Sequence, residues 1–196
     1  MASEIELKYV PQGNFSRETL FSDPEIKGRM GEIKKISMET EYLDTIDGKA
    51  SSLGITLRRR CENGESVIYA KSGKSTIGAL SIRGEWRVPS DDVKNAAKLL
   101  AEEGAPTEQL FGKELCITAR VSFTRYECTV TPHPGFSFSL SYDEGVLGRD
   151  HNFCEIELEL LDGECEELLE FGEKLAEKLS LIPETRSKYK RALLYM

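Results

Sequence analysis

The amino-acid sequence predicts an α+β protein, in which a closed eight-stranded antiparallel β-barrel carries helices packed on its outside. Three observations lead to this prediction. Seven short segments alternate apolar and polar residues with a period of two, as strands with one buried face do. The polar faces of these segments gather charges that are mainly of one sign, basic on the middle segments and acidic on the first and last. Segments of helical periodicity lie between them, and their apolar faces need a surface to cover.

The strands predicted in the first half of the chain cover residues 4–8, 55–60, 67–71 and 81–88. In the first of them, Glu4, Glu6 and Lys8 share one face, because side chains alternate along a strand. The polar faces of the other three strands are mainly basic, and they carry Arg58, Arg60, Lys71, Arg83, Glu85 and Arg87.

The second half contains three further predicted strands, at residues 117–123, 136–143 and 154–160. In the first of them, Arg120 lies opposite the apolar face, and in the second Asp143 shares its face with three serines. The last strand has an acidic face, which consists of Glu155, Glu157 and Glu159.

Helices are predicted at residues 16–21, 90–104, 163–181 and 187–195. Ser16 and Ser90 are candidate N-caps, and Gly104 is a candidate stop for the second helix. The order strands, helix, strands, helix indicates two similar halves without a clear sequence repeat. We therefore expect one domain over residues 1–196.

The charged strand faces can point toward solvent or toward one another. For a single antiparallel strand, a solvated polar face is the commoner arrangement. Here the polar faces carry clusters of one sign, and the helices need the apolar strand faces as their partners. A sheet of about eight strands that closes with its apolar face outward would enclose a charged, water-filled lumen and would have no exposed edge.

A lumen with this charge predicts a bound polyanion and a bound metal ion. Unpaired buried cations are costly, and arginine side chains match phosphate oxygens bidentately. Clustered carboxylates repel one another unless a cation lies among them, and hard Mg²⁺ or Mn²⁺ prefers oxygen ligands. Both charge sets suit a metal-bound phosphate chain.

Composition excludes several other classes of protein. The chain has 26 Lys+Arg against 34 Asp+Glu, a net charge of −8, which argues against a general nucleic-acid or membrane-surface binder. It has no apolar run of the roughly 20 residues that span a membrane, and its charged N-terminus does not resemble a signal peptide, so we expect a cytoplasmic protein. Its five cysteines include no CxxC pair, so neither a zinc site nor a disulfide framework is predicted.

The segment EIELK at 4–8 resembles the ExExK signature of the CYTH superfamily, the triphosphate tunnel metalloenzymes. A lone ExExK is weak, but further matches follow in the order of the family along nearly the whole chain. They are YLDT (42–45), LRRR (57–60), Lys71, RGEWR (83–87), Arg120, YDEG (142–145), EIELEL (155–160) and SKYKRAL (187–193).

This resemblance implies an eight-stranded tunnel that binds a triphosphate, with roles for its lumenal residues. Its metal ligands would be Glu4 and Glu6, Glu155 and Glu157 on the opposite wall, and Asp143 near a second metal. Glu159 and Glu85 would have supporting roles. Phosphate oxygens would be held by Lys8, Arg58, Arg60, Lys71, Arg83 and Arg120, and the C-terminal helix would close the tunnel with Lys188 and Arg191.

The placement of two further arginines stays open. Arg87 stands where the family more often has an acidic residue, so it either contacts phosphate or faces the tunnel mouth. Arg125 is out of phase with Arg120 unless a bulge intervenes.

The function that this resemblance implies is metal-dependent hydrolysis of a triphosphate, with inorganic triphosphate split to phosphate and pyrophosphate. Water would be activated by a two-metal arrangement with Mg²⁺ or Mn²⁺, and Lys8, Arg58 and Lys71 are the candidate catalytic residues. Lys71 is also a hypothetical proton acceptor, because neighbouring cations would lower its pKa. The alternatives are a class IV adenylyl cyclase that makes cyclic AMP from ATP, and a non-catalytic triphosphate-binding module. The expected partner is a small polyanionic substrate, with no nucleic acid and no membrane, for a monomer or a homodimer.

Overall fold

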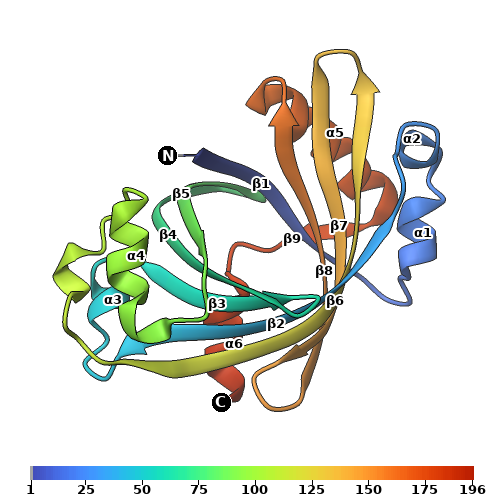
Figure 1. The fold of residues 1–196 in the computed structure, drawn as a ribbon. Coiled ribbons are helices and arrows are strands. Elements are labelled where there is room, and N and C mark those ends of the chain that lie inside the picture. Colours follow the sequence, from blue (N-terminus) through green and yellow to red (C-terminus); the bar gives the residue numbers. More distant parts are fainter. Residues whose placement is uncertain (1) are drawn as a thin grey trace.

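One antiparallel sheet curls until its first and last strands pair (Figure 1). The computed structural model describes residues 2–196, and within them the side chains apart from those at positions 2, 3, 74 and 76. The sheet order is β5-β4-β3-β2-β6-β7-β8-β1, and β1 pairs with β5 to close the barrel. The predicted closed eight-stranded antiparallel barrel is therefore confirmed.

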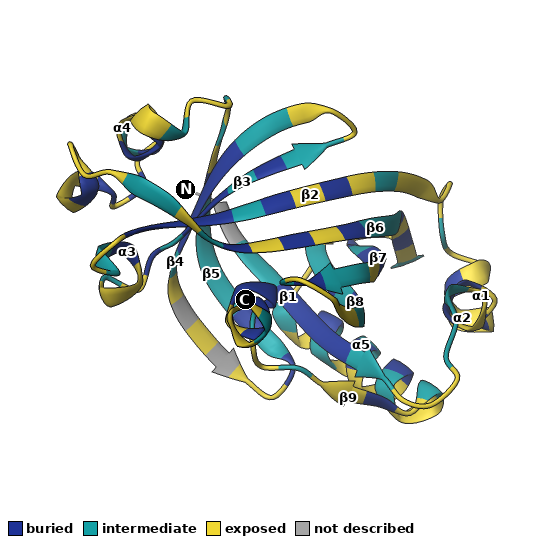
Figure 2. Ribbon diagram, turned by 90° about the horizontal axis from the view of Figure 1, so that it is seen from below, coloured by how far each residue is buried: buried dark blue, intermediate teal, exposed yellow. Residues whose placement is uncertain are grey.

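The seven strands that the alternation predicts are longer than expected, and the pattern does not predict an eighth strand, β2. Their bounds are β1 (Ala2–Pro11), β2 (Lys34–Thr45), β3 (Thr56–Glu62), β4 (Glu65–Ile77), β5 (Leu80–Pro89), β6 (Leu115–His133), β7 (Phe136–Leu147) and β8 (His151–Asp162). A short ninth strand, β9 (Leu181–Pro183), extends the sheet beside the end of β1. Buried and exposed residues alternate along β2 and β6, as Figure 2 shows.

The apolar outer face of the barrel is covered by two groups of helices, as predicted. One group is α1 (Arg17–Phe21), α2 (Pro24–Lys27) and α5 (Cys165–Leu179), which share an apolar core with β1, β6, β7 and β8. In this core, α5 approaches β1 so closely that a Cβ on Gly172 would lie 2.2 Å from Leu7 Cδ1. Any larger residue at this crossing would force the buried side chain of Leu7 to move, which favours glycine.

The second group is α3 (Lys49–Ser52) and α4 (Ala96–Glu102), which cover β3, β4 and β5 around the buried Trp86. The expected N-cap Ser90 is wrong, because Asp92 caps a 3₁₀ turn at Val93–Asn95 that precedes α4. A second 3₁₀ turn, Glu108–Leu110, leads toward β6. In the described part of the chain, no helix combines the length and apolar character needed to cross a membrane.

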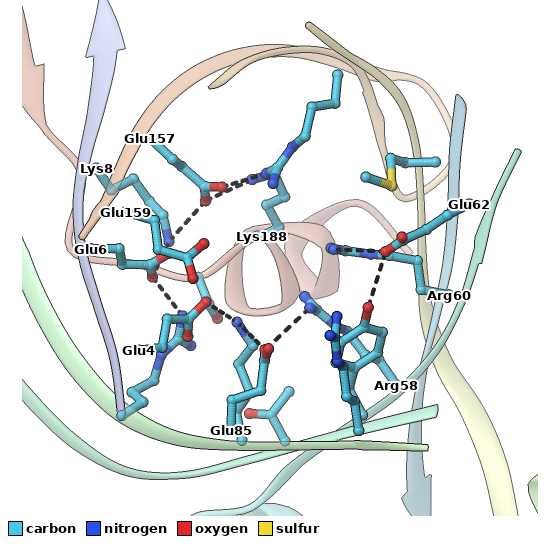
Figure 3. A pocket seen from close by; sticks show the side chains of 18 of the residues that line it. Glu4, Glu6, Lys8, Arg58, Arg60, Glu62, Glu85, Glu157, Glu159 and Lys188 are labelled. Carbon is cyan, nitrogen blue, oxygen red and sulfur yellow. Dashed lines mark hydrogen bonds and ion pairs between the residues drawn. The ribbon is translucent and has the colours of Figure 1, made fainter. Parts of the chain in front are cut away.

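The last helix, α6 (Lys188–Ala192), lies on the inner side of the sheet and is followed by a 3₁₀ turn at Leu193–Tyr195. Tyr189 stacks on Tyr42 of β2 with 4.7 Å between ring centroids. Tyr189 and Ala192 pack in an apolar cluster with Met38, Tyr42, Ala119, Val121, Phe123 and Leu147. Because β2 and β6 present apolar side chains inward here, α6 fills this part of the interior and closes the tunnel behind the charged residues (Figure 3).

Candidate active site

A cavity of about 250 Å³ lies inside the barrel, and charged side chains form most of its wall (Figure 3). Its basic residues are Lys8, Arg58, Arg60, Lys71, Arg83, Arg87, Arg125 and Lys188. Its acidic residues are Glu4, Glu6, Glu62, Glu85, Glu127, Glu157 and Glu159. The predicted charged lumen is therefore present, and most of the predicted site residues line it.

Arg58 and Arg60, on β3, form a basic wall of the cavity. The guanidinium of Arg58 lies over the ring of Tyr69, 4.4 Å from its centroid. The nearest acidic partner of Arg60 is Glu62, at 3.8 Å. Burial, together with Arg58 and another nearby guanidinium, lowers the pKa of Arg60 to about 10. The wall thus has an excess of positive charge, which a bound anion would stabilise.

Across the cavity, β1 and β8 present Glu4, Glu6 and Glu159 (Figure 3). No described side chain forms an ion pair or hydrogen bond with Glu159, and burial together with Glu4 raises its pKa to about 7. The buried Glu4 Oε2 accepts no hydrogen bond. Burial opposes ionisation of Glu6, but nearby cations, Lys8 first, lower its pKa to about 2. These carboxylates suit a hard divalent cation, because it prefers oxygen ligands and would supply the positive charge that Glu159 does not receive in an ion pair from any described side chain.

Other lumenal residues hold the two walls in position. Arg83 Nη2 lies 2.6 Å from Glu6 Oε1 and 3.3 Å from Glu4 Oε2. Lys71 Nζ lies 2.5 Å from Glu4 and 2.8 Å from Glu85. The hypothesis that cations surround Lys71 is therefore wrong, because its direct neighbours are carboxylates. Glu85 also lies 3.6 Å from Arg58, so this carboxylate contacts two cations of the lumen.

A second acidic group, the deep cluster of Asp143, Glu155 and Glu157, lies beside the lumen where α6 begins. One carboxylate oxygen of each lies within 4.8 Å of the other two. Asp143 and Glu155 are fully buried and do not line the cavity. Lys188 Nζ lies 2.9 Å from Asp143 and 2.9 Å from Glu157, and it also contacts Glu155. Against the effect of burial, these three carboxylates raise the pKa of Lys188.

The prediction that Arg120 holds phosphate is wrong, because its side chain lies outside the barrel. It is 59 % exposed and pairs with Glu41 at 3.3 Å. Arg125 of the same strand faces the interior instead, with 2.8 Å contacts to both oxygens of Asp143. The inner face of β6 is apolar beside α6, at Val121 and Phe123, and becomes charged only at Arg125. No bulge separates Arg120 from Arg125, so the two side chains lie on opposite faces of β6 and only Arg125 points inward. Near Arg120 the inward face is the apolar one, contrary to the prediction.

Two other predicted positions are now located. Arg87 is exposed and belongs to the rim of the cavity, which favours the mouth over the interior. Arg191 does not line the tunnel; it contacts the buried Glu155 and borders a separate cavity of about 340 Å³. Sequence reasoning missed Glu62 and Glu127, although each continues the inward phase of its strand from Arg60 and Arg125.

Removing the side chain of Arg125 should destabilise the protein far more than removing that of Arg120. Arg125→Ala leaves the fully buried Asp143 without its bidentate partner, and breaking such a buried pair costs about 3–5 kcal/mol. Arg120→Ala breaks an exposed ion pair worth about 0.2–1 kcal/mol. Urea denaturation of the two variants measures both losses, and equal small losses would contradict the inward placement of Arg125.

The stability of the metal-free protein should decrease as pH rises through the titration of Glu159. The pKa of this group is about 7 in the folded protein against an ordinary 4.5, so the folded state keeps a proton that the unfolded chain releases. As pH rises from about 4.5 to about 7, the titration of Glu159 lowers the free energy of unfolding by up to about 3 kcal/mol. Glu159→Gln should reduce this dependence in denaturation at pH 5 and pH 8 with chelator present. A variant with the wild-type pH dependence would contradict the assignment, and exposed Glu32→Gln is the control.

Comparisons with known proteins agree with this barrel. The sequence profile of the CYTH domain matches residues 2–193. HpAC1 of Hippeastrum, named as an adenylyl cyclase and described as having a dominant triphosphatase activity, is 20% identical over 95% of this chain and 93% of its own, with a TM-score of 0.66. A protein of Pyrococcus horikoshii OT3 is 25% identical over 97% of this chain and 98% of its own, with a TM-score of 0.56. A Bacillus halodurans protein named as an adenylate cyclase is 17% identical over 97% of this chain and 98% of its own, with a TM-score of 0.58. Among proteins of curated function, none matches the sequence.

Proposed function

The chain belongs to the CYTH domain family, and from this premise we propose that it hydrolyses inorganic triphosphate to phosphate and pyrophosphate with Mg²⁺ or Mn²⁺. The observation that carries the proposal is the opposition of two walls in one cavity (Figure 3). Arg58 and Arg60 lie on one side, and Glu4, Glu6 and Glu159 on the other. A phosphate chain between them would meet arginines along one side and a metal-binding carboxylate group along the other.

The basic wall would bind and orient the phosphate chain. Arginine forms paired, charge-assisted hydrogen bonds with phosphate oxygens. Glu85 and Tyr69 restrict the guanidinium of Arg58, so little side-chain freedom remains to be lost when an anion binds. In phosphoryl transfer, positioning and charge stabilisation provide most of the rate acceleration. We therefore assign to these arginines the stabilisation of the departing pyrophosphate.

The acidic wall would hold the divalent cation. Glu4, Glu6 and Glu159 fit such an ion, because Glu159 has no ion-pair partner among the described side chains and Glu4 Oε2 accepts no hydrogen bond. When bound there, the ion would neutralise phosphate charge and lower the pKa of a coordinated water. Arg83 and Lys71 would keep Glu4 oriented, and Arg83 and Lys8 would do the same for Glu6.

The dimensions and lining of the cavity favour a compact inorganic substrate. Its 250 Å³ is below the roughly 300–1,000 Å³ of pockets that hold drug-sized organic ligands. Its two tyrosines are already engaged, Tyr69 by Arg58 and Tyr42 by Tyr189, so neither offers a free ring for a nucleobase. The reaction class agrees with the activity described for HpAC1, which shares the fold.

The test is steady-state turnover with Mg²⁺ and with Mn²⁺, using inorganic triphosphate, ATP and thiamine triphosphate side by side and identifying every product. We expect phosphate and pyrophosphate in equal amounts from inorganic triphosphate, with ATP nearly inert. Cyclic AMP and pyrophosphate from ATP would instead identify a cyclase. Tight binding without turnover of any substrate would identify a binding module.

A further inference from the structure

We propose that the ammonium of Lys188 fills the deep cluster of Asp143, Glu155 and Glu157, so that the substrate-free protein binds one divalent ion instead of two. The inference rests on the proposed metal site at Glu4, Glu6 and Glu159. It concerns the other group of carboxylates, for which the resemblance to the family and the clustering of acidic residues both predict a metal ion.

The position of Lys188 is the first observation. Its Nζ lies 2.9 Å from Asp143 Oδ2 and 2.9 Å from Glu157 Oε1, and it also contacts Glu155 Oε1. These are the three carboxylates whose oxygens lie close enough together to share an ion. The ammonium therefore occupies the place that a divalent cation would need, and the cation could enter only by displacing it.

The charge of the cluster is the second observation. Its three carboxylates are matched by three buried cations: Lys188, Arg125 and Arg191. Lys8 adds a fourth positive charge, 3.5 Å from Glu157. Every carboxylate of the deep cluster already has a cationic partner, so a divalent ion there would add two positive charges with no unpaired carboxylate to balance them. At the other site, Glu159 has no cationic partner among the described side chains. The two acidic groups therefore differ in what they can bind.

The anchoring of α6 keeps Lys188 in this position. Ser187 caps the helix by accepting a hydrogen bond from the backbone N–H of Lys190. Tyr189 stacks on Tyr42, and Ala192 is fully buried against the inner face of the sheet. Because the neighbouring residues are packed, the backbone of Lys188 cannot withdraw without undocking α6.

The test counts Mn²⁺ ions bound to the full chain without substrate, by equilibrium dialysis and by titration calorimetry. We expect one ion per wild-type chain. Lys188→Met should create a second site and raise the count to two, and Lys188→Met with Asp143→Asn should return it to one. Lys190→Met is the matched control, because Lys190 is exposed on the same helix and should leave the count at one.

The outcomes separate this inference from the proposed function. Two ions on the wild-type chain would overturn the inference and leave the proposed function intact. No ion on the wild-type chain would overturn the proposed metal site itself. A folded Lys188→Met protein that still binds one ion would also overturn the inference. If that variant fails to fold, the wild-type count decides, together with electron paramagnetic resonance, which detects the dipolar coupling of two nearby Mn²⁺ ions.

Discussion

Replacing Glu6 by glutamine is expected to lower metal-dependent triphosphate hydrolysis about a hundredfold to a thousandfold without unfolding the barrel. Glu6 is nearly fully buried on β1 and ionised well below neutral pH, so it offers a fixed negative oxygen to a cation. Glutamine keeps the shape of the side chain but removes that charge, which weakens metal binding and the neutralisation of phosphate that depends on it. Glu4→Gln should act in the same way. The measurements are kcat at saturating Mn²⁺ and the Kd of Mn²⁺.

The matched control is Glu39→Gln, because Glu39 is exposed on the outer face of β2. Its activity should stay within a factor of two of wild type. Circular dichroism and thermal denaturation of all three variants distinguish loss of metal from loss of fold. Wild-type activity in both Glu4→Gln and Glu6→Gln would remove these residues from the metal site.

Replacing Arg58 by alanine is expected to reduce kcat/KM for inorganic triphosphate by about a hundredfold. Arg58 is buried in the basic wall, and hydrogen bonds between ionised groups are worth about 1.5–3 kcal/mol each. A loss of about 2.7 kcal/mol corresponds to a hundredfold change. We expect the change in both KM and kcat, because the same guanidinium would bind the substrate and stabilise the departing pyrophosphate.

The adjacent residue provides a control on the same strand. Arg59 points outward and pairs with Glu41 on the surface of the barrel, so Arg59→Ala should leave kcat/KM within a factor of three. The comparison isolates the direction of the side chain, since the two positions share strand, residue type and substitution. Equal losses in the two variants would contradict the tunnel as the site of phosphate binding.

The sequence allows the walls of the tunnel to be predicted where polar character and inward direction coincide. Polar character and inward direction coincide on β1, β3, β5 and β8, where charged residues at alternate positions line the cavity. On these strands the outward residues that helices cover are apolar, as at Trp86 beneath α4. The period-two pattern is then sufficient to assign both faces of the strand.

The prediction fails where the interior itself is apolar. Val121 and Phe123 face inward on β6 because α6 packs against them, so the polar Arg120 is left outside. Nothing in the local pattern of β6 reveals this, since the partner is Tyr189 near the other end of the chain. The placement of Lys188 among carboxylates depends on the same contact. Those parts of the site are fixed by tertiary packing and not by periodicity.

The pairing of β1 has a consequence for how the protein forms. One edge of β1 pairs with β5, where Glu4 lies opposite Arg83, and the other pairs with β8, where Glu6 lies opposite Glu159. A strand near the start of the chain thus cannot complete its ladder until a strand near the end has been synthesised. Contacts so distant in sequence slow folding, and a nascent chain that lacks β8 retains unpaired strand edges, which are prone to aggregation. The acidic wall, which combines Glu4 and Glu6 with Glu159, does not exist in any shorter intermediate.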